Sequence, residues 1–110
     1  MRVDFRRFND AVVAEPQDER LDVSSAAGFK GQMVDAINNG SLRLVLNLSK
    51  VQFIDSSGLT AIISTIKTLG PEGKLVVCGL NHHTRNLFKL TRLDRIIGVF
   101  NGEEEALKSL

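Results

Sequence analysis

The sequence has a single cysteine, almost no net charge and no long apolar run. Cys78 cannot form an internal disulfide, and its apolar neighbours 75–77 are typical of a core position in a cytoplasmic protein. The formal net charge is +1, which gives no basis for nucleic-acid binding. No apolar stretch approaches the ~18 residues of a membrane span, and charges interrupt the first seven residues. We therefore expect a cytoplasmic protein with no nucleic-acid partner, no membrane partner and no signal peptide.

The chain has 110 residues, of which 43% are hydrophobic and 25% charged, as in an ordinary folded domain. This length predicts one domain over residues 1–110. Alternating residues from Val3, a turn at Asn9-Asp10 and an apolar run from Ala11 to Ala14 predict an antiparallel hairpin that ends at Pro16.

From residue 24 onward, helix and strand patterns alternate. The expected elements are a helix capped by Ser24 or Ser25 and ending at Asn39-Gly40, a strand over 42–48, a helix ending at Gly70-Pro71, a strand over 74–78, a helix over 84–90, a strand over 96–100 and a helix over 103–110. The first three of these helices have predicted buried faces. They are Phe29, Met33 and Ile37 in the first helix; Leu59, Ile62, Ile63, Ile66 and Leu69 in the second; and Leu87, Phe88 and Leu90 in the third.

This alternation predicts an α/β fold, with a mixed, mostly parallel sheet of four or five strands and about four helices. Binding surfaces of such sheets form from the loops beyond the carboxyl ends of the strands. Here those loops are 16–25, 53–58 and 79–83.

The segment Asp55-Ser56-Ser57-Gly58-Leu59 lies where a strand ends and a helix begins. The first amides of a helix are unpaired and its dipole is positive there, so Ser56 could carry a phosphate of roughly −1.5 to −2 charges. The same residues also suit a helix cap, with Ser56 or Asp55 accepting an amide hydrogen bond. Spacing alone favours the cap, and both interpretations remain open at this point.

The sequence offers little for catalysis. The G-x-S-x-G pattern of serine hydrolases is absent around Ser56, and no Gly-rich phosphate loop is present. His82 and His83 are adjacent, so on a helix they point about 100° apart and cannot chelate one ion well. We expect both histidines to be exposed at a helix start. No enzyme activity, metal site or cofactor is predicted, and a serine hydrolase is the weakest alternative.

Several segments resemble the STAS domain, and more narrowly the bacterial anti-sigma factor antagonists. The resemblance runs from about residue 20 to the end and rests on Val45-Leu46-Asn47-Leu48, Phe53-Ile54-Asp55-Ser56-Ser57-Gly58-Leu59, Leu75-Val76-Val77-Cys78-Gly79 and Asn86–Leu93. It implies that the unphosphorylated protein binds an anti-sigma factor and so frees a sigma factor. It also implies phosphorylation of Ser56, with Ser57 unmodified, by that anti-sigma factor acting as an ATP-dependent serine kinase. A metal-dependent serine phosphatase would restore Ser56.

The resemblance also implies a partner surface. The family's G-E-L-D segment corresponds to Glu19-Arg20-Leu21-Asp22, in which Leu21 and Asp22 match while Glu19 and Arg20 depart from the pattern. The expected partner-binding residues are Asp22, Ser24, Asp55, Ser56, Ser57, Gly58 and Thr60. Some STAS domains are instead accessory or scaffold subunits without phosphorylation, and this alternative remains.

Overall fold

The computed structural model describes all 110 residues and is built on a five-stranded sheet of order β1-β2-β4-β6-β7. The strands are β1 (Val3–Phe8), β2 (Ala11–Pro16), β4 (Arg43–Asn47), β6 (Lys74–Cys78) and β7 (Gly98–Phe100). β1 pairs antiparallel with β2 through the predicted hairpin, and all other pairs are parallel. The expected mixed, mostly parallel sheet is confirmed, with β4 at its centre.

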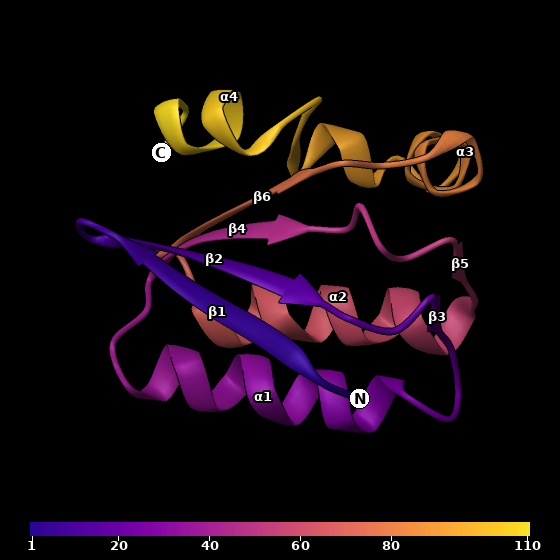
Figure 1. The fold of residues 1–110 in the computed structure, drawn as a ribbon, viewed down its shortest axis with the longest axis horizontal. Coiled ribbons are helices and arrows are strands. Elements are labelled where there is room, and N and C mark those ends of the chain that lie inside the picture. The colour runs from indigo at the N-terminus through magenta and orange to yellow at the C-terminus, as the bar shows by residue number, and fades with distance from the viewer.

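A second, two-stranded sheet lies beyond the carboxyl ends of the main strands (Figure 1). It pairs β3 (Arg20–Leu21) with β5 (Phe53–Ile54) in parallel, so that Arg20 lies opposite Phe53 and Leu21 lies opposite Ile54. No sequence pattern predicts this second sheet. Its effect is to tie the loop after β2 to the loop before the next helix.

The chain forms four helices. They are α1 (Ala26–Asn38), α2 (Ser56–Leu69), α3 (His82–Leu90) and α4 (Glu103–Lys108). α1 and α2 run side by side along one face, and α4 lies on the other (Figure 1). The α/β class and the number of helices agree with the prediction. None of these helices has the length and apolar character required to span a bilayer.

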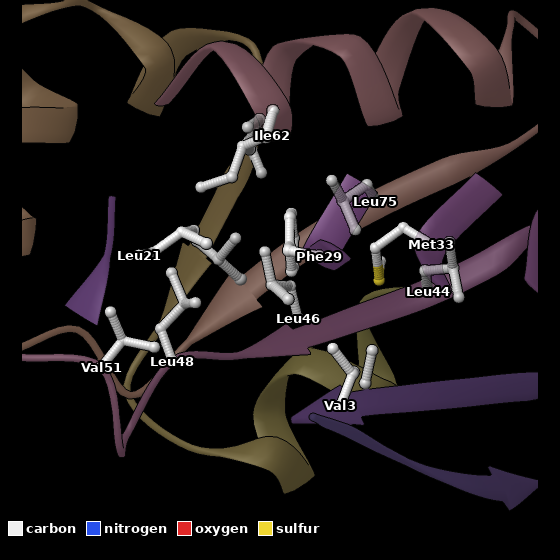
Figure 2. Packing of buried hydrophobic residues seen from close by; sticks show 14 of the residues in the cluster. Val3, Leu21, Phe29, Met33, Leu44, Leu46, Leu48, Val51, Ile62 and Leu75 are labelled. Carbon is white, nitrogen blue, oxygen red and sulfur yellow. The ribbon is translucent and has the colours of Figure 1, made fainter. Parts of the chain in front are cut away.

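The main core lies between the sheet and the α1–α2 layer. Figure 2 shows Phe29 and Met33 of α1 and Ile62 of α2 gathered with Leu44 and Leu46 of β4, and all five are fully buried. Burying a side chain of this size stabilises the fold by about 1.5–3 kcal/mol.

The predicted buried face of α2 is only partly correct. Ile62 and Leu69 are buried as expected, but Leu59, Ile63 and Ile66 are only partly buried against the core. The remaining fully buried positions of α2 are the small residues Gly58, Ala61 and Thr65. Small side chains face inward where α2 packs closely against α1 and β3, and Leu59, Ile63 and Ile66 lie at the margin of the contact.

The chain after α3 also departs from the prediction. Leu90 is 82% exposed, and α3 instead packs through Thr84 and Phe88, which are one turn apart. The expected strand over 96–100 begins only at Gly98, and Ile96 is 71% exposed. Residues 96 and 97 instead form a turn and a bend after the short 3₁₀ helix Leu93–Arg95, whose Leu93 is buried in the core.

A smaller core lies under α4, on the opposite face of the sheet. Ala106 of α4 covers Val13, Val45, Val76 and Cys78. Cys78 is 1% exposed, which confirms its predicted place in the core. Burial raises the pKa of its thiol to about 11.

Candidate functional site

Asp55, not Ser56, caps helix α2. Oδ1 of Asp55 accepts a hydrogen bond from the Gly58 amide at 3.0 Å, which satisfies one of the unpaired amides of the first turn. Oδ2 of the same carboxylate accepts from the Val23 amide at 3.2 Å. One side chain therefore fixes the start of α2 and the loop before α1 against each other.

Ser56 is the first residue of α2 and is exposed. Its hydroxyl makes no hydrogen bond within the protein, while its carbonyl oxygen accepts from Thr60 Oγ1 at 2.8 Å. Thr60 is exposed one turn further along the same helix, and Ser57 is half-buried. Of the two adjacent serines, Ser56 has the more accessible hydroxyl.

Gly58 is buried beneath this surface and acts through its lack of a side chain. A Cβ at this position would lie 2.2 Å from the carbonyl oxygen of Leu21 and 2.9 Å from Leu21 Cγ. Only glycine therefore allows the first turn of α2 to approach β3 so closely. The structure gives Gly58 a role in shaping the surface, and a direct contact of Gly58 with a partner stays a prediction.

The loop between β3 and α1 is held by its own side chains. Asp22 Oδ1 accepts from the Ser24 hydroxyl at 2.6 Å and from the Ser24 amide at 3.0 Å, and Asp22 Oδ2 accepts from Arg20 Nε at 3.2 Å. The Ser24 hydroxyl, and then the Arg20 guanidinium, hold the pKa of Asp22 below its usual value. The carboxylate therefore stays ionised and fixes the shape of this loop.

Ser25 occupies the N-cap position of α1, as predicted, but it does not cap the helix. Its hydroxyl donates to the Arg20 carbonyl at 2.9 Å and accepts from the Asp22 amide at 3.0 Å. Between these anchored residues, the Val23 side chain is 77% exposed.

The third predicted loop joins the same end of the molecule. Asn81 caps α3 by accepting from the Thr84 amide at 2.9 Å, and it also donates to the carbonyl of Gln52 at 3.1 Å. The ring of His83 stacks on Phe53 with ring centroids 5.1 Å apart and planes inclined by 20°. The Arg20 guanidinium lies 4.3 Å from the centroid of the same Phe53 ring.

His82 and His83 are exposed at the start of α3, as expected. No three histidine, cysteine, aspartate or glutamate side chains are grouped in a way that could hold a metal ion.

The structure thus brings most of the predicted site residues to one end of the sheet. The residues with atoms at this surface are Asp22, Ser24, Asp55, Ser56, Ser57 and Thr60, and Gly58 lies directly beneath. The place of Arg20, Val23, Phe53 and His83 at this surface was not predicted from the sequence. An apolar residue within the polar loop 22–25 is a signal that could have indicated Val23. The contacts of Phe53 join elements more than 25 residues apart, so no local pattern predicts them.

Comparison with known proteins agrees with this architecture. The family model of the STAS domain matches residues 3–106. The "Anti-sigma F factor antagonist" of Paenibacillus polymyxa is 32% identical over 92 residues, which cover 82% of this chain and 79% of that protein. The protein in a crystal structure from Thermotoga maritima is 28% identical in sequence to this chain. The two structures superpose with a TM-score of 0.91, and the match covers 97% of this chain and 92% of that one.

A third comparison concerns the fold alone. The Bacillus cell fate determinant SpoIIAA, solved in its phosphorylated form, is 20% identical with a TM-score of 0.74, and the match covers 98% of each chain.

The chain belongs to the STAS domain family, and its similarity to named relatives places it with the anti-sigma factor antagonists of that family. The resemblance that the sequence analysis identified is therefore confirmed.

Proposed function

We propose that this protein is an anti-sigma factor antagonist controlled by phosphorylation of Ser56. Its unphosphorylated form binds an anti-sigma factor and releases a sigma factor, and the phosphate on Ser56 abolishes that binding. The observation that carries the proposal is the division of roles at the start of α2. Asp55 supplies the cap, so the exposed hydroxyl of Ser56 is free to accept a phosphate.

The local structure suits a phosphate at this position. Ser56 is the first residue of a 14-residue helix, where amides without intrahelical partners and the positive end of the dipole favour an anion. Its hydroxyl has no hydrogen bond to lose, and the modification displaces no buried group. The existence of a phosphorylated form of SpoIIAA, which has the same fold, is consistent with this expectation.

A phosphate would act on the complex more than on the fold. Two unit charges about 5 Å apart interact by roughly 3 kcal/mol at an effective dielectric constant of ~20. One partner carboxylate facing phosphorylated Ser56 would therefore lower the affinity by about a hundredfold, since each ~1.4 kcal/mol is tenfold. The added bulk would further oppose a fitted interface.

The chemistry in this scheme belongs to the partners. The anti-sigma factor is the ATP-dependent serine kinase, and a metal-dependent serine phosphatase removes the phosphate. This chain is the substrate of both and is not itself an enzyme. Because these partners control transcription, we place the protein in the bacterial cytoplasm.

The proposal is tested by phosphorylation with the cognate kinase and ATP. Wild type and Ser57→Ala should take up phosphate at Ser56, as mapped by phosphopeptide mass spectrometry, while Ser56→Ala should take up none. Phosphate on Ser57 alone would overturn the assignment. A chain that binds its partner and is never phosphorylated would instead be a STAS accessory or scaffold subunit, and labelling by an active-site serine probe would indicate a hydrolase.

A further inference from the structure

Two carboxylates at this end of the sheet, those of Asp55 and Asp22, are turned toward the protein. The two oxygens of Asp55 accept from the Gly58 and Val23 amides. Those of Asp22 accept from Ser24 and from Arg20. These two acidic groups are therefore occupied in shaping the loops, and neither of the two carboxylates has both oxygens available for a partner.

The cation beside them is placed differently. Arg20 uses only Nε in its ion pair with Asp22, and its two terminal amino groups have no partner in the structure. Its side chain is 62% exposed. A guanidinium offers five N–H donors in a fixed fork, so Arg20 retains the pair of donors that binds a carboxylate in a bidentate manner.

The Arg20 guanidinium is also held in position. It lies over the ring of Phe53, its direct neighbour across the β3–β5 pair, and His83 stacks on the same ring. We call Arg20, Phe53 and His83 the stacked cluster. Its aromatic contacts and the ion pair with Asp22 restrict the side chain before any partner arrives, which lowers the entropy cost of using it in an interface.

We infer that the stacked cluster extends the partner surface beside Ser56, with Arg20 binding a carboxylate on the anti-sigma factor. This inference rests on the proposed function and adds a partner chemistry to it. Arg20 makes the contact, while Phe53 and His83 are positioning residues that hold the guanidinium. The inferred partner surface is acidic, and an acidic surface is also the kind that a phosphate on Ser56 would repel.

The test measures the affinity of the unphosphorylated chain for the purified anti-sigma factor by titration calorimetry at two salt concentrations. Arg20→Gln should weaken binding about tenfold and reduce the salt dependence, because a charge-assisted contact is lost. Arg20→Lys should lie between wild type and Arg20→Gln, since it keeps the charge but loses the planar fork. Phe53→Leu should weaken binding less than Arg20→Gln, because Arg20 keeps its charge and loses only its aromatic support.

Arg7→Gln is the matched control. Arg7 is exposed, takes part in no ion pair, and pairs with Val12 near the opposite end of the sheet. Its replacement makes the same charge change and should leave the affinity at the wild-type value. Thermal melting of each variant separates a loss of binding from a loss of folding.

Two negative results have different meanings. If wild type binds and Arg20→Gln binds equally well, the role of Arg20 is wrong and the proposed function stands. If folded wild-type protein binds no anti-sigma factor kinase, the proposed function fails and the inference fails with it.

Discussion

Replacing Asp55 with alanine should destabilise the fold more than replacing it with asparagine does. The Asp55→Ala change removes the α2 cap, which costs about 1 kcal/mol. It also leaves the Val23 amide without its acceptor, which costs about 1 kcal/mol more. The free energy of unfolding should therefore fall by about 2 kcal/mol. For a domain of this size that corresponds to a decrease in melting temperature of roughly 8 °C.

Asparagine keeps an oxygen that can cap α2, and the structure contains the precedent. Asn81 caps α3 through the Thr84 amide at 2.9 Å, with the same spacing as Asp55 and Gly58. Asp55→Asn should therefore keep the cap, but its Nδ2 is a donor and cannot accept from the Val23 amide, so this variant should lose about 1 kcal/mol, roughly half the loss of Asp55→Ala. Ser56→Ala should melt close to wild type, because the Ser56 hydroxyl makes no hydrogen bond. Chemical and thermal denaturation followed by circular dichroism measure all three. An Asp55→Ala variant as stable as wild type, or a Ser56→Ala variant as unstable as Asp55→Ala, would refute this account of the cap.

Three further outcomes follow from the packing and the charges. Gly58→Ala should destabilise the fold by about 1–3 kcal/mol in chemical denaturation, because its Cβ would collide with the Leu21 carbonyl; an unchanged midpoint would contradict that packing. Cys78, whose thiol pKa is raised to about 11 by burial, should resist alkylation at pH 8 until the protein unfolds, and rapid reaction of the folded protein would show an accessible thiol. The Arg6 guanidinium lowers the pKa of Glu103, so the Arg6–Glu103 pair should stabilise the fold at neutral pH, and this contribution should be lost as the pH falls through the folded-state pKa of Glu103, below the usual 4.5. The melting temperature of Glu103→Gln should therefore depend less on acid pH than that of wild type, and an identical dependence would exclude the pair as the source of the acid sensitivity.

The main elements could be predicted because each carries a strong local signal. Asn39-Gly40 and Gly70-Pro71 mark the ends of α1 and α2, and the apolar run over 42–48 indicates the central strand β4. Such signals depend on residues that are neighbours along the chain. They suffice for the order of helices and strands, and this order specifies the parallel sheet.

The missed features depend on contacts between distant segments. β3 and β5 are two residues each, too short for a period-2 pattern, and they form because the loops after β2 and β4 meet. Thr65 was not expected in the core, yet it is fully buried, with its hydroxyl donating to the Ala61 carbonyl at 2.9 Å. Leu90 is an apolar residue at helical spacing that the short helix α3 leaves in solvent.

The candidate site likewise has one part that the local sequence predicts and another that depends on contacts between distant segments. Ser56 and Asp55 could be singled out from one contiguous segment, although the sequence did not decide which of them caps α2. Arg20 was recognised only as a departure from a family pattern. Its place over Phe53 and beside Asp22 required the structure.

The central claim is that phosphate on Ser56 controls binding without unfolding the protein. The most direct measurement compares the affinities of the unphosphorylated and the Ser56-phosphorylated chain for the anti-sigma factor, beside their melting temperatures. The account predicts a loss of affinity of about a hundredfold or more, with both forms melting at nearly the same temperature. Ser56→Asp should show a smaller loss, and Ser56→Ala should bind like wild type and stay insensitive to the kinase. Equal affinity of the two forms, or a loss of binding that only follows a loss of folding, would contradict the account.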